Sequence, residues 1–295
     1  MQTMHHGWIR KGIGSFYTVV SDGAEYVCKA RGRFRNEGLT PVPGDGVEFE
    51  LGEDGGGYLL AIEPRRNLLI RPAVANLDKL MIVLAASRPV PDLLLVDKLL
   101  LQCETLGILP VIVCNKCDEQ DALLYADLLA QYRPAGYAVL GVSAKTGEGI
   151  ERVRAQIAGS KCCFAGQSAV GKSSLLNALV PELALQVGGL SRKTERGRHT
   201  TRHAELYPVC GGAVLDTPGF SLLDIQAMEP NTLAGYYPEM RRHTAQCRFA
   251  ACLHVSEPEC AVKPLITSGA LHPQRYARYV ELLTELKEIR RHKYD

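Results

Sequence analysis

The stretch at residues 166–173, GQSAVGKS, fits the phosphate-binding pattern G-x-x-x-x-G-K-[ST] at every fixed position. Its glycines let the backbone curl so that successive N–H groups converge on phosphate oxygens, and Lys172 would reach the β- and γ-phosphates. The hydroxyl of Ser173 would face Mg²⁺. The expected phosphate-contacting residues are Gly166, Gln167, Ser168, Ala169, Val170, Gly171, Lys172, Ser173 and Ser174.

The residues around this loop have the context that a phosphate-binding loop needs. Residues 161–165, KCCFA, read as a short buried strand, and residues 173–180, SSLLNALV, have the spacing of a helix. A glycine-rich turn that matches the pattern by chance is the alternative interpretation. Because strand, loop and helix follow in the required order, the sequence predicts a nucleotide site here.

Length and composition describe a globular protein of more than one domain. The chain has 295 residues, of which 46% are hydrophobic and 22% charged, and this length can hold several cores. The net charge of +2 indicates no partner by itself. The sequence shows no run of about 18 apolar residues and no apolar signal core at its start, so we expect a cytoplasmic protein without a membrane segment.

Residues 1–70 form the first expected domain, a small β-barrel of the OB-fold type. Short β-rich runs alternate there with Gly, Asp and Pro turns, at residues 14–20, 25–30 and 47–51. Arg31, Arg33 and Arg35 alternate beside Phe34, and strand spacing would put their guanidinium groups on one face. An RNA-binding face and a solvated edge strand, charged against aggregation, are both open interpretations.

Residues 71–225 form the second expected domain, in which apolar strands alternate with amphipathic helices. Residues 80–85 and 109–114 read as buried strands, and residues 92–106 carry Leu at helical spacing between them. This βαβ order predicts a doubly wound parallel sheet. The ligands of such sheets lie at the carboxyl ends of the strands.

The motif Asn115-Lys116-Cys117-Asp118 stands at the carboxyl end of the second of these strands. Asp118 would accept hydrogen bonds from the ring N–H and the exocyclic amine of guanine, while Lys116 would lie along the base. A purine without those donors would leave a buried carboxylate unpaired, at a penalty of roughly 1 to 3 kcal/mol or more. Without the phosphate loop elsewhere in the chain, a surface turn after a strand would be the default interpretation.

Ser143, Ala144 and Lys145 follow the next expected strand, at residues 137–141. In guanine-nucleotide sites a backbone N–H from such a turn bonds O6 of the base, which adds discrimination against adenine. Small and polar residues are weak evidence by themselves. Their position at the end of a strand is what makes them candidates for the same site.

Beyond the phosphate loop, residues 186–203 are polar and rich in Gly, Arg and Thr. They are either a flexible loop or a switch that becomes ordered when a Thr hydroxyl meets Mg²⁺ and the γ-phosphate. Further on, Asp216 would hold Mg²⁺ through water, and the N–H of Gly219 would touch the γ-phosphate. Phe220 follows where many GTPases have a water-orienting glutamine, so the group that orients water must come from elsewhere.

The motifs stand in an unusual order, because the base-reading motifs precede the phosphate loop. Each motif lies at its own strand end, so joining the original termini and cutting the chain elsewhere would preserve the site. The sequence therefore predicts a circularly permuted GTPase domain. In this arrangement the segment after Asp216 leads directly into the C-terminal region.

The order NKCD, SAKTGEG, GQSAVGKSSLLN, GRHTT and DTPGF resembles that of the circularly permuted GTPases of the RsgA (YjeQ, EngC) family, over nearly the whole chain. The resemblance implies a GTPase of late small-subunit maturation, with weak hydrolysis that the small ribosomal subunit stimulates. It also implies that His199 positions the attacking water. Where the family commonly has a longer Thr run, this chain has Thr200 and Thr201 only, and Thr201 is the expected Mg²⁺ contact.

Residues 226–295, the third expected domain, contain Cys247, Cys252, His254 and Cys260 in the pattern C-x4-C-x-H-x5-C. Thiolates with one imidazole suit a tetrahedral structural Zn²⁺. Reduced cysteines without metal are the alternative. The surrounding segment, however, has too few apolar residues to fold stably without a cross-link such as a bound metal. The chain has ten cysteines in all, and those that fall in apolar strands, such as Cys114, Cys162, Cys163 and Cys210, are expected in the core.

Basic residues near this cluster are candidate contacts with rRNA phosphates, namely Arg241, Arg242, His243 and Arg248. The last helix, from Pro273, ends in basic residues with intervening glutamates, so a salt-bridged solvated face is an open alternative there. The expected partners are GTP or GDP and the small ribosomal subunit with its rRNA, bound by a monomer. A nucleotide-gated RNA-binding scaffold with little turnover is the alternative function.

Overall fold

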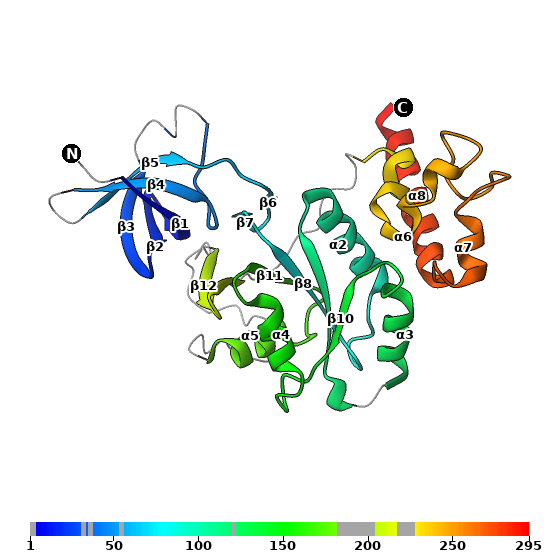
Figure 1. Cartoon of the computed structure of the whole chain (residues 1–295), viewed down its shortest axis with the longest axis horizontal. Helices are drawn as coiled ribbons and strands as arrows, with labels where there is room; N and C mark the ends of the chain where they lie inside the picture. Colours follow the sequence, from blue (N-terminus) through cyan, green and yellow to red (C-terminus); the bar gives the residue numbers. More distant parts are fainter. Residues whose placement is uncertain are drawn as a thin grey trace.

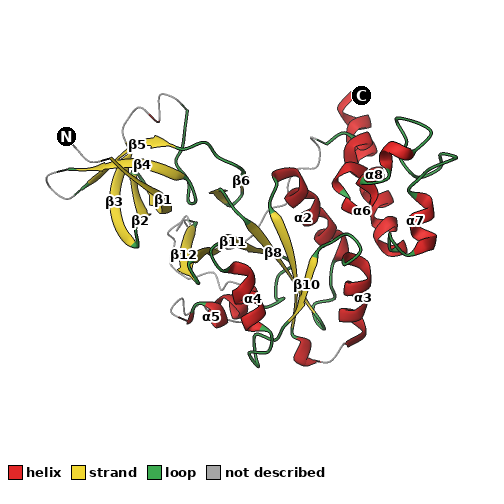
Figure 2. Cartoon of the chain, viewed as in Figure 1, coloured by secondary structure: helices red, strands yellow, loops and turns green. Residues whose placement is uncertain are grey.

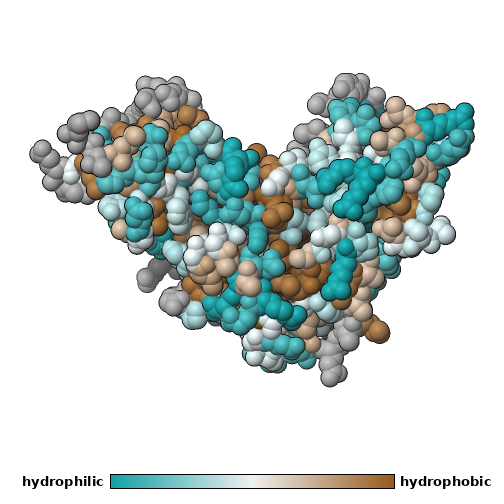
Figure 3. Space-filling model, viewed as in Figure 1, coloured by the Kyte–Doolittle hydropathy of each residue, from teal (hydrophilic) through white to brown (hydrophobic). Residues whose placement is uncertain are grey.

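The computed structural model describes residues 4–30, 34, 38–52, 56–119, 122–181, 204–216 and 228–294 of the chain. Figure 1 shows a β-barrel at the N-terminal end, a central α/β sheet and a helical C-terminal part. In Figure 3 the barrel and the C-terminal helices form two lobes with a broad notch between them, and hydrophilic residues cover much of both lobes. The predicted multidomain fold class is confirmed.

The N-terminal barrel closes one sheet on itself. Its strands are β1 (Met4–Ile13), β2 (Phe16–Ser21), β3 (Ala24–Ala30), β4 (Gly46–Leu51) and β5 (Gly57–Ile62). They follow the order β1-β2-β3-β5-β4, and β1 also pairs with β4, which closes the barrel. Alternate side chains point inward, among them Ile9, Val19 and Phe49, which are fully buried. The predicted barrel is confirmed, although the sequence did not indicate β1 and β5.

The arginines expected on one barrel face cannot be placed, because Arg31, Arg33 and Arg35 lie outside the described residues. Phe34, which stands between them, is described, and its side chain is buried in the barrel core together with Phe49. The RNA-binding face and the solvated edge strand therefore both stay predictions for this segment.

The central sheet has the strand order β10-β9-β8-β11-β13-β12. Its strands are β8 (Lys79–Ala85), β9 (Leu109–Asn115), β10 (Ala138–Gly141), β11 (Lys161–Ala165), β12 (Glu205–Val209) and β13 (Gly212–Asp216). All neighbours pair in parallel except β12, which runs antiparallel to β13. The predicted doubly wound sheet is confirmed, and the carboxyl ends of its parallel strands meet at one edge. Cys114, Cys162 and Cys163 are buried as predicted, but the prediction for Cys210 is wrong: it is exposed, because it lies on the turn between β12 and β13 rather than in a strand.

Helices cover both faces of this sheet (Figure 2). The first two of the following helices pack on one face and the last two on the other: α2 (Leu93–Leu106), α3 (Ala122–Tyr132), α4 (Ile150–Ile157) and α5 (Lys172–Leu179). A short 3₁₀ turn, η1 (Cys117–Glu119), follows β9. A small hairpin of β6 (Leu68–Ile70) and β7 (Ala73–Ala75) connects the barrel to the sheet.

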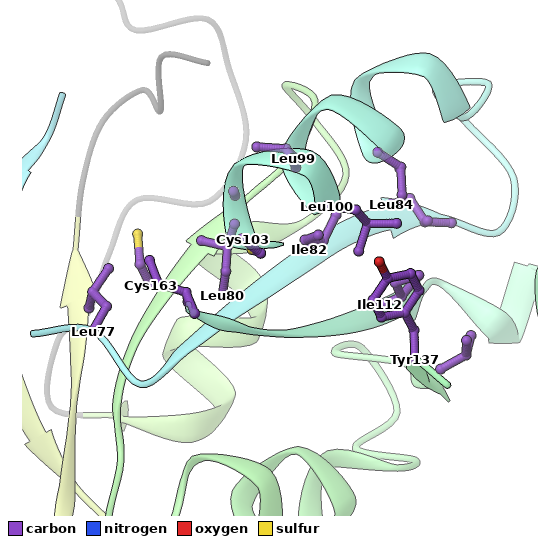
Figure 4. Close-up of a cluster of buried hydrophobic side chains, with 14 of the residues drawn as sticks. Leu77, Leu80, Ile82, Leu84, Leu99, Leu100, Cys103, Ile112, Tyr137 and Cys163 are labelled. Carbon is purple, nitrogen blue, oxygen red and sulfur yellow. The ribbon is translucent and has the colours of Figure 1, made fainter. Parts of the chain in front are cut away.

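The period of two along β8 explains this layered packing. Leu80, Ile82 and Leu84 belong to the core under α2 and α3, whereas the residues between them belong to the core under α4 and α5. Figure 4 shows the first set beside Leu99 and Leu100 of α2. A strand buried on both faces reads as a continuous apolar run, as the sequence of β8 does.

The C-terminal part is helical and has a core of its own. Its elements are η4 (Pro230–Tyr236), α6 (Pro238–Arg241), η5 (Thr244–Gln246), α7 (Lys263–Ser268) and α8 (Pro273–Tyr294). Their core includes Cys252 and Cys260, together with Leu101 from α2. α2 therefore contributes to the central core and to the C-terminal core. Among the described residues, no helix combines the length and the apolar composition that a membrane crossing needs.

A buried charge cluster fixes the C-terminal part against α2. The Asp97 carboxylate, which is fully buried, accepts hydrogen bonds from Arg275 and Arg278, both at 2.6 Å. Arg275 also pairs with Glu239, and its guanidinium carbon lies 4.7 Å from the centroid of the Tyr237 ring. Removal of one partner would leave an unpaired buried charge, which is strongly destabilising. The cluster therefore fixes the position of the C-terminal helices against α2.

Candidate nucleotide site and candidate metal centre

The loop after β11 has a backbone that only glycine fits at two positions. Gly166 has a φ of +136°, and a Cβ there would lie 2.0 Å from the carbonyl O of Val83. Gly171 has a φ of +94°, and its Cβ would lie 2.3 Å from Nδ2 of Asn115. Left-handed φ values and these close approaches together exclude side chains. Both fixed glycines of the sequence pattern are thus explained by the loop geometry.

Lys172 begins α5, and its ammonium group closes over this loop. Nζ donates to the carbonyl O atoms of Gly166 (2.8 Å) and Gln167 (2.5 Å). Burial lowers the pKa of the Lys172 ammonium. A partly desolvated cation attracts an anion more strongly than a solvated one, so the position suits a phosphate. The remaining predicted residues lie on the loop or on the first turn of α5, namely Ser168, Ala169, Val170, Ser173 and Ser174.

Asn115 joins three of the predicted motifs. It ends β9, it is 2% exposed, and its Nδ2 donates to the carbonyl O of Val170 in the phosphate loop at 2.9 Å. Its Oδ1 accepts from the N–H of Ala144, after β10, at 3.0 Å. Cys117 points back to its own strand, where Sγ donates to the carbonyl O of Cys114 at 3.2 Å. One carboxamide therefore holds the ends of β9, β10 and β11 together.

Asp118 and Ser143 face each other across this junction. The Ser143 hydroxyl donates to Oδ1 of Asp118 at 2.7 Å, and Nζ of Lys145 lies 3.8 Å from Oδ2. The hydrogen bond from Ser143 is the main cause that lowers the pKa of Asp118, although burial opposes it. The carboxylate is therefore ionised at neutral pH and is a pure acceptor, as the predicted recognition of N–H donors requires.

The segment between β8 and α2 also borders the site. The sequence did not indicate this contribution. Nζ of Lys116 donates to the carbonyl O of Arg88 at 2.6 Å. The carboxamide of Gln167 donates to the carbonyl O of Val90 (3.2 Å) and accepts from the N–H of Asp92 (3.0 Å), the N-cap of α2. These contacts use backbone atoms, so no residue type in this segment could reveal them.

A cavity of about 510 Å³ opens between these groups. It is lined by residues of β9, η1, the turn after β10, the phosphate loop and α5, namely Asn115, Lys116, Asp118, Glu119, Ala144, Lys145, Gly171, Ser174, Asn177 and Ala178. Small-molecule sites have volumes of about 300 to 1,000 Å³. Most of the predicted base-reading residues, without Cys117 and Ser143, and part of the predicted phosphate loop thus border one cavity of suitable size.

The predicted hydrolysis groups are placed only in part. His199, Thr201 and Gly219 lie outside the described residues. Asp216 is described by its backbone, which ends β13 and pairs with Glu205 of β12. Because β13 lies next to β11, this end of β13 shares a sheet edge with the phosphate loop. The roles assigned to these four residues stay predictions.

The four predicted metal ligands come together in the C-terminal part. The ligand atoms of Cys247, Cys252, His254 and Cys260 all lie within 4.8 Å of one another. Nδ1 of His254 is 3.5 Å from Sγ of Cys247 and 3.4 Å from Sγ of Cys260. Tetrahedral bonds of about 2.3 Å to sulfur and 2.0 Å to nitrogen give an N···S separation of about 3.5 Å. The four residues therefore form a candidate metal centre.

Glu257 holds the backbone of this centre, and the sequence did not single it out. Its carboxylate accepts from the N–H groups of Leu253 (3.1 Å), Val255 (2.9 Å) and Ser256 (3.1 Å). Burial opposes its ionisation, yet these backbone donors lower the pKa of Glu257 to about 2. A carboxylate in a polar loop carries no sequence signal of its own, because its partners are backbone groups.

Two family models match the chain. The model described as RsgA GTPase matches residues 62–226, and the model described as RsgA N-terminal domain matches residues 6–59. The first covers more than half of the chain and includes the phosphate loop and both base-reading motifs. The second lies on the barrel strands.

Individual proteins match over nearly the full length. A protein of Moorella thermoacetica named "Small ribosomal subunit biogenesis GTPase RsgA" is 46% identical over 283 residues, which cover 95% of this chain and 97% of that protein. The crystal structure of YjeQ from Thermotoga maritima superimposes with a TM-score of 0.84 at 35% identity, over 96% of this chain and 99% of that one. The crystal structure of YloQ, described as a circularly permuted GTPase, has a TM-score of 0.83 at 36% identity, over 97% and 96%.

Proposed function

The chain belongs to the RsgA GTPase family, and we propose that it hydrolyses GTP to GDP and phosphate in late maturation of the small ribosomal subunit. The observation that carries this proposal is the junction at Asn115, which ties the phosphate loop to the turn that begins at Ser143. A nucleotide in the adjoining cavity would be read at its base and its phosphates by one rigid frame.

Guanine recognition in this proposal uses Asp118 and the turn after β10. The ionised Asp118 would accept from the ring N–H and the exocyclic amine of the base. The N–H of Ala144 already donates a hydrogen bond to Oδ1 of Asn115. We therefore assign the contact with O6 of guanine to the backbone N–H of Lys145. Lys116, whose ammonium is held by Arg88, would lie along the base.

Asp118→Asn is expected to lower GTP affinity about 100-fold and to favour a xanthine nucleotide. The amide presents an N–H to the exocyclic amine of guanine, whereas xanthine has a carbonyl oxygen there. Fluorescence titration with guanine and xanthine nucleotides measures both affinities. Asp127→Asn, the same chemical change on α3, is the matched control. An Asp118→Asn protein that keeps its preference for guanine would contradict the assignment.

Hydrolysis in this proposal takes place where β11 and β13 end side by side. Mg²⁺, when bound, neutralises charge on the β- and γ-phosphate oxygens. Ser173 follows Lys172 on α5, and Asp216 ends β13, so both stand at the same sheet edge as candidates to hold the cation. Thr201 and Gly219 are the proposed γ-phosphate contacts. His199 is proposed to position the attacking water in place of the glutamine that Phe220 replaces.

The metal of the C-terminal centre is proposed to be Zn²⁺ with a structural role. Three thiolates and one imidazole at tetrahedral spacing suit zinc better than the hard cations that prefer oxygen. Four protein ligands leave no position for water or substrate. The cation would therefore stabilise the fold of this part and take no part in hydrolysis.

We place rRNA contacts beside the metal centre. A hollow of about 710 Å³ there is lined by polar and small residues and by three of the candidate metal ligands; its polar side chains include Thr232, Thr244 and Arg248. Arg248 pairs with Glu259 and lies 5.6 Å from the ring centroid of Phe249, at a position open to solvent. An exposed ion pair is worth about 0 to 1 kcal/mol, so a phosphate could replace this carboxylate easily.

The end of α8 suits the alternative of a salt-bridged solvated face. Arg290 pairs with Glu229, and Nζ of Lys98 lies 2.8 Å from the carboxylate of Glu285. These pairs tie α8 to its neighbours within the chain. We therefore assign the RNA contacts of the C-terminal part to the metal-centre side and leave the α8 pairs as internal supports.

The proposed function is tested by hydrolysis of GTP and of ATP, with and without purified small ribosomal subunits. The subunit is expected to raise GTP turnover at least about tenfold, and ATP turnover is expected to stay low. His199→Ala should lose this rise and still bind GTP. If the subunit leaves GTP turnover unchanged, the assignment of the small ribosomal subunit as the partner is wrong. If ATP is hydrolysed as fast as GTP, the assignment of the base-reading residues is wrong.

The same proposal places the chain in the cytoplasm, where small subunits are assembled, as a monomer. It divides the chain into a barrel domain at residues 1–70, a GTPase domain at residues 71–225 and a metal-binding domain at residues 226–295. Separate cores in the barrel, the central sheet and the C-terminal helices support this division.

A further inference from the structure

Strands β12 and β13 form a hairpin between the two segments proposed to contact Mg²⁺ and the γ-phosphate. β12 begins at Glu205, soon after Thr201, and β13 ends at Asp216, soon before Gly219. Glu205 and Asp216 stand opposite each other in the hairpin register. The open end of the hairpin therefore leads into the proposed hydrolysis groups, whereas the base-reading residues and phosphate loop lie at the ends of β9, β10 and β11.

The barrel is joined directly to this hairpin. β1 pairs antiparallel with β12, with Lys11 opposite Glu205. Barrel and central strands thus form one continuous 11-stranded sheet. In Figure 1 β12 lies between the barrel and β11. Among the described residues the two strands meet at the one backbone pair of Lys11 and Glu205, so a shift of β1 there would act on the start of β12.

A β-bulge in β1 directs Arg10 into this junction. The register against β2 slips at Arg10, and such a bulge re-aims the side chain of the extra residue. Arg10 pairs with Glu25 of the barrel and with Glu205 of the hairpin, the latter at 2.8 Å. Its guanidinium carbon lies 5.7 Å from the ring centroid of Tyr207, also on β12. The side chains of Arg10 and Glu205 are each 19% exposed, so water screens their attraction only in part.

We propose that Arg10 and Glu205 are positioning residues for GTP hydrolysis, an inference that rests on the proposed function. They clamp the barrel to the strand that pairs with Asp216, and so hold the proposed Mg²⁺ ligand in line with the phosphate loop. Lys11 adds a second cation 3.3 Å from the same Glu205 carboxylate.

Other contacts hold the barrel at the opposite end of the hairpin. Nζ of Lys161, which begins β11, donates to the carbonyl O of Gly44 at 3.2 Å and lies 5.3 Å from the ring centroid of Trp8. Arg66 pairs with Asp78 at 2.7 Å, next to β8. Loss of the contact between Arg10 and Glu205 would therefore leave the barrel attached to the central sheet. It would loosen only the open end of the β12–β13 hairpin, which leads to the proposed hydrolysis groups.

The test uses the full chain with Arg10→Ala and with Glu205→Gln. Lys29→Ala, which removes an exposed cation from the same barrel, is the matched control. Single-turnover GTP hydrolysis is measured against Mg²⁺ concentration, and GDP affinity is measured without Mg²⁺. Both clamp variants are expected to need about tenfold more Mg²⁺ for the half-maximal rate, with GDP affinity within about twofold of the unaltered chain. Lys29→Ala should match the unaltered chain in both measurements.

An unchanged Mg²⁺ requirement in both clamp variants would overturn the inference and leave the proposed function standing. If Arg10→Ala fails to fold, as circular dichroism would show, Glu205→Gln decides, because it keeps the volume and the backbone pairing of β12. An equal loss of Mg²⁺-free GDP affinity would also overturn the inference, since it would indicate general damage. Failure of the unaltered chain to hydrolyse GTP would refute the proposed function itself.

Discussion

Replacement of Lys172 by alanine is expected to lower GTP affinity at least about 100-fold and to abolish hydrolysis. The ammonium is partly buried, which lowers its pKa, and it is held by backbone carbonyls of Gly166 and Gln167. Phosphate oxygens would offer full negative charge at this position. Without Lys172, that charge would be left to backbone N–H groups and Mg²⁺ alone. Titration with a fluorescent GTP analogue and single-turnover hydrolysis measure the two effects.

Lys79→Ala is the matched control for this prediction. Lys79 begins β8, and its ammonium also donates to a backbone carbonyl, that of Gln156, at 2.5 Å. It stands at the amino end of its strand, however, at the edge of the sheet away from the phosphate loop. The control should therefore bind GTP like the unaltered chain. A Lys172→Ala protein with normal GTP turnover would contradict the assignment of residues 166–174 as the phosphate-binding loop.

The central sheet and its site motifs could be predicted because their signals are local. Strands buried on both faces appear as apolar runs, and each motif lies within a few residues of the strand that carries it. The predicted family is confirmed by the family models and by relatives that match nearly the whole chain. Motif order was informative because circular permutation changes the order of strand ends and leaves each strand end intact.

The junctions between the parts could not be predicted, because their partners are far apart in the sequence. β1 reads MHHGWIRKGI, which has neither a clear alternation nor a continuous apolar run, since it lies partly in the barrel and partly against β12. Asp97 stands within a leucine-rich helix and would pass for a solvated residue. Its partners Arg275 and Arg278 follow only from the way α8 docks on α2. No spacing rule connects such residues.

Replacement of Cys252 by alanine is expected to release the metal and to melt the C-terminal helices. Cys252 and Cys260 are each 7% exposed and lie inside the C-terminal core, so the centre and the apolar packing are one structure. Structural Zn²⁺ contributes about 10 kcal/mol or more of binding free energy in small zinc domains at neutral pH. Metal content by mass spectrometry and hydrogen exchange along α8 measure the outcome. The matched control is Cys210→Ala, which removes an exposed thiol on the turn after β12. It should keep the metal content and the hydrogen-exchange protection of the unaltered chain.

The loss is expected to reach the GTPase part through α2. Once the C-terminal helices melt, Leu101 loses the core that covers it, and the buried Asp97 carboxylate loses Arg275 and Arg278. Burial of a leucine side chain is worth about 1.5 to 3 kcal/mol, and the ion pairs of Asp97 are lost as well, so the central domain should unfold at a lower temperature in Cys252→Ala. Thermal release of bound fluorescent GDP measures this directly. Release at the temperature of the unaltered chain, in a protein shown to lack metal, would mean that α2 holds its place without the C-terminal helices.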